Sequence, residues 1–223
     1  MRPSNCLLLL LLSFGLLSPA LLGCQTQRPV DQLRDRGDFY FERGDYLAAI
    51  DEYQQIADRY PGDWRAQHQL GRAALELEQY SRAQRALEVA HTLRPADHDI
   101  ADDLAEAMLQ VGSHEQLFAF LRERAESSQS PRAWRQLGRY AMELGDPDSA
   151  RTAFERAIIH DGGQSVEPYL DAARFAEEIG DLETAVRRLR QAYGINPRHQ
   201  EVRERLINLG EVPGPTLALP PGR

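Results

Sequence analysis

The sequence predicts an all-α fold: a right-handed α-solenoid of about five helix pairs with a capping helix at its C-terminal end. Two observations support this prediction. Along most of the 223 residues, apolar side chains recur three or four positions apart, which is the spacing of one helix face. The same pattern of small and large residues also returns at intervals close to 34 residues, which indicates one structural unit that is repeated and stacked.

The repeated units follow one another through the middle of the chain. Four residues of the first unit recur 34 residues later: Gly37, Tyr46, Ala49 and Pro61 return as Gly71, Tyr80, Ala83 and Pro95. This register predicts a repeat domain over residues 31–198, with units near residues 30–63, 64–97, 98–130, 131–165 and 166–199. Each unit reads as two amphipathic helices separated by a break such as Gly44-Asp45 or Gly145-Asp146.

The third unit departs from the pattern. Leu117 stands where neighbouring units have alanine, Arg124 stands where they have a small residue, and no proline closes the unit. Larger side chains at these positions would keep the paired helices apart. We therefore expect the second helix of this unit, near His114 to Glu126, to be displaced or more mobile than the others.

The C-terminal end is predicted in two parts. Residues 199–210 form an amphipathic helix that would cap the last unit, as terminal repeats require. Residues 211–223 contain four prolines and cannot continue a helix. Disorder is the first interpretation of this tail, and a strap that packs Leu217 and Leu219 on the body or on a partner is the second.

The first 23 residues read as a secretory signal, because a single arginine precedes the long apolar stretch Cys6 to Gly23. The stretch ends on "LLGC", Leu21 to Cys24, which resembles the lipobox of bacterial lipoproteins and implies lipid on Cys24. Residues 24–30 would then be a tether. Two other interpretations stay open: cleavage after Ser18-Pro19-Ala20 to release a soluble protein, or an uncleaved membrane anchor.

A lipid on Cys24 would place the protein in the cell envelope, anchored to a membrane. In a Gram-negative source, Gln25 rather than aspartate after the lipidated cysteine suggests the outer membrane, with the body facing the periplasm.

Composition and motifs exclude several classes of function. All 26 basic residues are arginine, so lysine chemistry is unavailable, and both cysteines lie in the first 24 residues. A net charge of −8 with no basic block argues against nucleic-acid binding. The acids around His98 read as helix caps, and the loop His160 to Ser165 reads as a connection between units. The sequence predicts no catalytic residue, no cofactor and no metal site.

The repeated units resemble the tetratricopeptide repeat (TPR). The resemblance rests on Trp134, Leu137-Gly138 and Ala150 in unit four, and on Leu70-Gly71, Ala83 and Pro95 in unit two. It implies that the first helix of each unit lines a concave groove whose exposed residues bind a protein partner. On the matching positions, the implied partner-binding residues are Arg65, His68, Arg72, Arg132, Arg135, Arg139 and Arg174, and unit three contributes Asp99, Asp102 and Glu106 instead.

Together these features predict a membrane-anchored, non-catalytic scaffold in the bacterial cell envelope. Its partner would be a protein with an acidic segment, within the assembly of a pilus, a secretion system or an outer-membrane complex. Two alternatives stay open: an envelope enzyme or ligand-binding protein with a site in the concave groove, and a self-assembling structural lipoprotein.

Overall fold

A computed structural model describes residues 28–214 and 216–222, and these ranges contain eleven α-helices and no strand. The predicted signal segment, Cys24 and most of the tether lie outside the described residues. The helices are α1 (Val30–Glu42), α2 (Tyr46–Arg59), α3 (Trp64–Glu76), α4 (Tyr80–Leu93), α5 (His98–Val111), α6 (His114–Ser128), α7 (Pro131–Glu143), α8 (Pro147–Asp161), α9 (Glu167–Glu178), α10 (Leu182–Ile195) and α11 (Gln200–Asn208).

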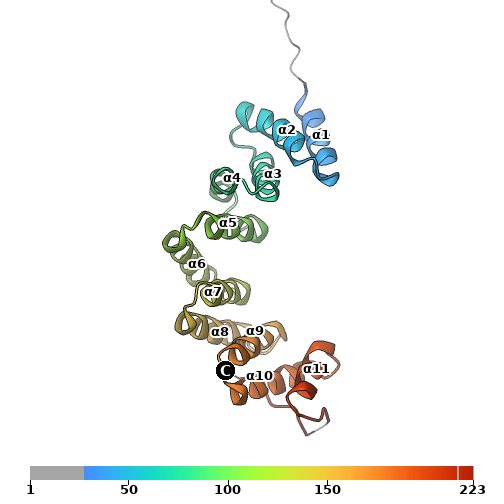
Figure 1. Ribbon diagram of the computed structural model, residues 1–223, viewed down its shortest axis with the longest axis vertical. Coiled ribbons are helices and arrows are strands. Elements are labelled where there is room, and N and C mark those ends of the chain that lie inside the picture. The colour runs from blue at the N-terminus through green and yellow to red at the C-terminus, as the bar shows by residue number, and fades with distance from the viewer. Residues whose placement is uncertain (1–27, 215, 223) are drawn as a thin grey trace, which may run out of the picture.

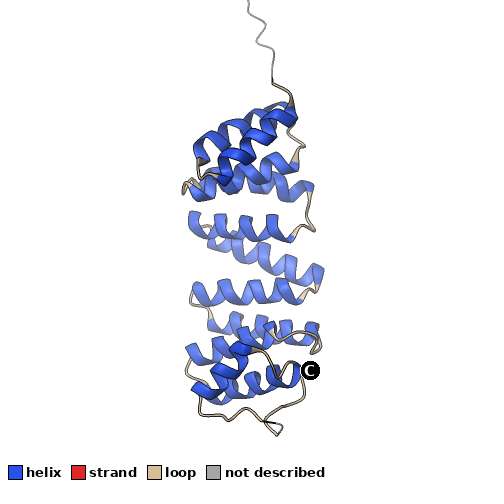
Figure 2. Ribbon diagram, turned by 90° about the vertical axis from the view of Figure 1, so that its right-hand side faces the viewer, coloured by secondary structure: helices blue, strands red, loops and turns tan. Residues whose placement is uncertain are grey.

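Consecutive helices pack as pairs, and the pairs stack into one elongated array (Figures 1 and 2). The closest packing lies within pairs, as between α1 and α2 or between α7 and α8. Each pair also contacts the next. The predicted all-helical solenoid of five helix pairs with a further C-terminal helix is confirmed. In the described part of the chain, no helix is both long enough and apolar enough to cross a membrane.

Aspartates at the breaks explain where many of these helices begin. The carboxylate of Asp63 accepts a hydrogen bond from the backbone N–H of Ala66 at 3.1 Å, and Asp146 accepts one from Ser149 at 3.1 Å. Such bonds satisfy backbone donors that have no partner within the helix. The repeated aspartate therefore sets the start of a helix in successive units.

Glycine on the first helix and a large residue on the second bring the paired helices together. A Cβ atom added at Gly71 would lie 2.5 Å from Leu87 Cγ, and one at Gly138 would lie 2.6 Å from the Phe154 ring. In unit one, a Cβ atom added at Gly37 would lie 2.5 Å from the Tyr53 ring. The glycine of the repeat is therefore required because a large side chain occupies the space of a Cβ atom.

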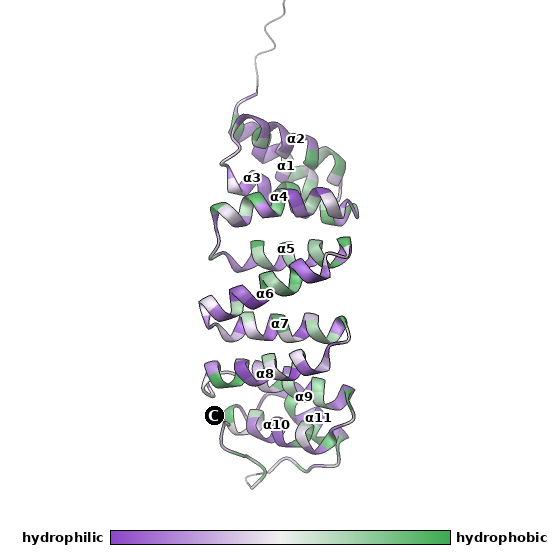
Figure 3. Ribbon diagram, turned by 90° about the vertical axis from the view of Figure 1, so that its left-hand side faces the viewer, coloured by the Kyte–Doolittle hydropathy of each residue, from purple (hydrophilic) through white to green (hydrophobic). Residues whose placement is uncertain are grey.

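Unit three packs differently. Helix α6 contacts α5 much less closely than the second helix of each other unit contacts its first, and its axis is visibly tilted (Figure 3). Leu117 is fully buried in place of the usual alanine, and Arg124 is 9 % exposed. The displacement expected from these two larger side chains is present. Greater mobility of the helix stays a prediction.

Buried Arg124 is accommodated by polar partners. Its guanidinium donates hydrogen bonds to Gln136 Oε1 of α7 and to His98 Nδ1 of α5, and it lies 3.5 Å from Asp102 Oδ1. Burial lowers the pKa of Arg124, whereas the Asp102 charge opposes that shift. The displaced helix is thus tied to both neighbouring helices through one charged side chain.

The C-terminal tail is ordered where it is described. The structure places residues 216–222 against α10, so this part of the tail is a strap rather than the disordered segment that its prolines favoured. Leu217 is 7 % exposed and belongs to the same apolar cluster as Leu189 and Leu206. Disorder was the poorer interpretation because the last unit leaves apolar surface that a short extended segment covers.

Candidate functional site

The seven predicted partner-binding residues lie on three first helices. Arg65, His68 and Arg72 are on α3, Arg132, Arg135 and Arg139 are on α7, and Arg174 is on α9. Within each helix they are three or four positions apart, so they share one side of that helix. The stack curves, and α1, α3 and α5 lie on its inner side (Figure 1). We call the surface formed by these first helices the inner face.

Acidic side chains of unit three pair with basic side chains of the two neighbouring units. His68 Nε2 lies 2.7 Å from Asp103 Oδ2. On the other side, an Arg132 guanidinium nitrogen lies 2.6 Å from Asp102 Oδ2 and 3.2 Å from Asp99 Oδ1. Helix α5 therefore supplies carboxylates to α3 and to α7.

A second set of ion pairs joins units four and five. Arg135 Nε lies 2.6 Å from an oxygen of Asp171, whose side chain is 7 % exposed. Arg174 lies 3.8 Å from the other Asp171 oxygen and 3.5 Å from Glu201 of α11. The buried Asp171 carboxylate requires such partners because an unpaired buried charge is strongly destabilising. Arg135 therefore has a structural role, because it neutralises the buried Asp171 carboxylate.

Two predicted residues have no carboxylate partner among the residues that the structure describes. Arg65 lies over the Trp64 ring, with 5.2 Å between its guanidinium carbon and the ring centroid. Arg139 is exposed and has neither a hydrogen bond nor an ion pair within residues 28–214 and 216–222. These two cations are the ones most available to an incoming acidic group.

A cleft of about 360 Å³ opens on the inner face of units one to three. Its basic lining residues are Arg34, Arg65, His68 and Arg72. Tyr53 also lines it and donates a 2.7 Å hydrogen bond to Asp38. Burial, with a further contribution from Asp38, raises the pKa of Tyr53 above its usual range, so the phenol stays a neutral donor. Asp38, Asp97 and Asp99 also line the cleft, so it combines basic and acidic groups with aromatic surface.

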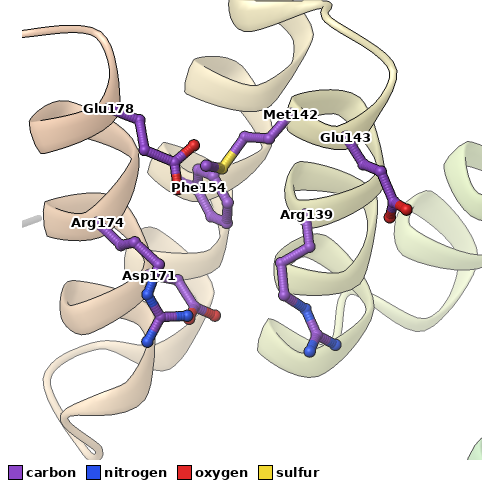
Figure 4. A pocket seen from close by; sticks show the side chains of 7 residues that line it. All are labelled: Arg139, Met142, Glu143, Phe154, Asp171, Arg174 and Glu178. Carbon is purple, nitrogen blue, oxygen red and sulfur yellow. The ribbon is translucent and has the colours of Figure 1, made fainter.

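A second cleft, of about 250 Å³, lies between α7 and α9. Figure 4 shows Arg139 projecting from α7 and Arg174 from α9, with Phe154 and Met142 between the two helices. Glu143 and Glu178 also line this cleft, so its charge is mixed. Such a cleft suits a short side chain or chain segment with both apolar and acidic groups.

The motifs that resembled chemical sites have structural roles. Asp161 accepts hydrogen bonds from the backbone N–H and the hydroxyl of Ser165, which holds the loop between α8 and α9 in place. Asp97 caps α5 through the N–H groups of Asp99 and Ile100. Among the described residues, no group of three or more histidine, cysteine or acidic side chains has an arrangement that would hold a metal ion.

Sequence comparison identifies the repeats directly. A tetratricopeptide repeat family model matches residues 40–101, and a second one matches residues 131–163. The chain is a tetratricopeptide repeat protein. No curated protein matches its sequence.

Several solved structures share the fold of this TPR protein. A crystal structure of MamA is 19 % identical, with a TM-score of 0.58, over 83 % of this chain and 98 % of that chain. MamA from Desulfovibrio magneticus RS-1 is 16 % identical over 77 % of this chain and 97 % of that chain, with a TM-score of 0.58. YrrB, described as a TPR protein with an unusual peptide-binding site, is 17 % identical over 79 % of this chain and 91 % of that chain, with a TM-score of 0.52.

Sequence reasoning named the basic residues of this TPR protein and two partners of Arg132, Asp99 and Asp102, but missed two other acidic partners. Asp103 and Asp171 were not singled out, although each lies 35 or 36 residues after the basic residue that it pairs with. That separation is close to one repeat. Comparing charges at equal positions in successive units would have found both pairs, because such positions are neighbours in a solenoid.

Proposed function

We propose that this TPR protein is a non-catalytic scaffold that binds a protein partner along its inner face. The observation that supports this proposal is the pair of clefts on that face, each lined by arginines and an aromatic ring. Both clefts are open to solvent and run between repeated units, which suits an extended chain better than a small molecule. The partner segment is acidic with apolar side chains.

The ion pairs within the protein show which arginines are already occupied and which can bind a partner. Arg132 and Arg135 already contact carboxylates of α5 and α9, so a partner would have to displace them. Arg65 and Arg139 are free to pair, and Arg72 is 4.0 Å from Asp103, which is a long and weak contact. We expect arginine–carboxylate bonds at these three positions to contribute about 1.5 to 3 kcal/mol each.

Site-specific photo-crosslinking in the native cell tests the inner face. A crosslinking residue at Gln69, which lines the larger cleft, should capture the partner, whereas one at Gln84 on α4 should not. Replacing Arg65, Arg72 and Arg139 together by glutamine should reduce the captured product by at least about tenfold. Arg85→Gln on α4 removes a comparable exposed charge and is the control.

Equal crosslinking from both positions, or an unchanged product in the triple variant, would contradict binding at the inner face. The helical content of each variant, measured by circular dichroism, has to match the parent for the comparison to hold.

We further propose that Cys24 carries lipid and holds the scaffold in the cell envelope, where it serves the assembly of a pilus, secretion or outer-membrane complex. The support is the "LLGC" sequence at the end of the apolar stretch. Cys24→Ser should move the protein from the membrane fraction to the soluble fraction. Retention of the variant after a carbonate wash would favour the uncleaved anchor instead.

A further inference from the structure

The C-terminal tail occupies a slot on the last repeat, away from the inner face. Leu217 is buried, and the backbone N–H of Leu219 donates to the carbonyl of Arg190 on α10 at 3.1 Å. Arg190 Nε donates to the Leu217 carbonyl at 2.9 Å, and the Tyr169 hydroxyl donates to the Gly222 carbonyl at 3.4 Å. The C-terminus accordingly lies beside α10 (Figures 1 and 3).

Two glycines of the body make room for the tail. A Cβ atom at Gly194, inside α10, would collide with the backbone carbonyl oxygen of Leu219. A Cβ atom at Gly163 would lie 2.5 Å from the Pro221 side chain. Glycine weakens a helix interior, so its presence at 194 needs a packing reason. The corresponding position of unit four, 35 residues earlier, is Ile159, whose side chain is exposed.

The slot exists because the stack ends there. In the preceding units the second helix packs on the first helix of the next unit, which has 12 to 14 residues, whereas α10 packs on α11, which has nine. The apolar surface left on α10 is filled by Leu217, which joins the cluster of Leu189, Val202 and Leu206. The tail segment thus covers apolar surface of α10 that the short α11 leaves open.

The contacts that hold the tail are few and largely independent of its sequence. One side chain, Leu217, is fully inserted, Leu219 is half-buried, and Ala218, Pro220 and Pro221 are exposed. The hydrogen bonds described above all use backbone groups of the tail. A segment held in this way competes with any other extended chain that offers a leucine and the same backbone shape.

We propose that this slot is a second peptide-docking surface, which the chain's own tail occupies in cis. Its partner is a protein segment of the tail's own kind: extended, with a leucine that fills the Leu217 position and prolines three and four residues later. The tail limits access because its local concentration at the slot is high. A partner therefore binds when its segment outcompetes the tail.

The test uses the full chain and a labelled synthetic peptide of residues 211–223. In the Leu217→Asp variant the tail should leave the slot, because a carboxylate is not tolerated in the apolar cluster. The peptide should then bind at least about tenfold tighter to Leu217→Asp than to the parent, in which the tail competes. Leu217→Ser is a milder second variant, which should also bind the peptide more tightly than the parent does.

A double variant, Leu217→Asp with Gly194→Val, keeps the tail out but blocks the slot, and it should lose peptide binding. Ile159→Val, at the corresponding position of unit four, is the matched control and should leave binding unchanged in the Leu217→Asp background. Circular dichroism of each variant shows whether the repeats are intact.

Three results would overturn the proposal. Equal affinity of the peptide for the parent and the variants, or no binding to any folded variant, would mean that the tail is only part of the last repeat. A parent that is dimeric and becomes monomeric on Leu217→Asp would show that the tail occupies the slot of a second copy instead.

Discussion

At the scale of single residues, the first-helix glycine of units one, two and four is matched to the large side chain opposite it. Gly71→Ala places a methyl group 2.5 Å from Leu87 Cγ. Overpacking costs about 1 to 3 kcal/mol, and the better helix propensity of alanine offsets about 1 kcal/mol of that. We expect a net loss of up to about 2 kcal/mol in the free energy of unfolding, measured in urea.

Gly62→Ala is the control for this substitution, because a Cβ atom there meets nothing within 4 Å. Its free energy of unfolding should change little. If Gly71→Ala were as stable as the parent, Leu87 would have moved aside and the close approach of α3 and α4 would not depend on the glycine.

His91 predicts a pH dependence of stability. Its ring packs edge-on against Phe120 of α6 at 5.1 Å, and burial followed by the nearby Arg124 charge lowers the pKa of His91 below 6.5. Below pH 6.5 the unfolded chain binds a proton that the folded protein resists, so stability falls as the pH drops through that value. It should recover as the pH rises above it.

Urea midpoints between pH 5 and pH 8 measure this effect. His91→Gln should flatten the pH dependence in that interval, whereas His114→Gln, at an exposed position, should leave it as in the parent. An unchanged pH profile in His91→Gln would mean that other groups carry the acid sensitivity.

At the scale of elements, α6 is the helix that departs from the repeat. It contacts α5 less closely than its counterparts contact their partners, although Leu117, Leu121 and Ala125 are buried in the apolar cluster. Looser packing within the pair allows local opening below the global free energy of unfolding. Amide hydrogen exchange should therefore be faster over residues 114–126 than over residues 149–159 of α8. Equal protection would mean that Leu117 and Arg124 compensate fully for the displacement.

At the scale of the whole molecule, stability is distributed along the stack rather than concentrated in one centre. The buried apolar residues form two large clusters, one mainly in units one to three and one mainly in units four and five with α11. Because each unit contacts only its neighbours, parts of the array can unfold separately.

The two tryptophans report on this behaviour, since Trp64 lies in unit two and Trp134 in unit four. In a Trp64→Phe variant, the fluorescence of Trp134 should follow a urea transition that differs from the loss of helical signal over the whole chain. Coincident transitions would indicate a single cooperative unit.

The sequence by itself determined the helices, their pairing and the repeat, because these depend on neighbours at fixed separations. Gly71 and Leu87 are 16 residues apart, and their size pattern recurs in unit four as Gly138 and Phe154. The displacement of α6 could also be anticipated, since Leu117 and Arg124 break that same local pattern.

Only the tertiary structure decided which charges of the inner face are already paired and where the tail lies. Among the residues that the structure describes, Arg135 has an acidic partner and Arg139 has none because of what the neighbouring units present, which no single repeat reveals. The tail docks because the stack ends at α11 and leaves apolar surface on α10, where Gly194 admits a backbone. Both outcomes depend on surfaces that form only when the units are stacked.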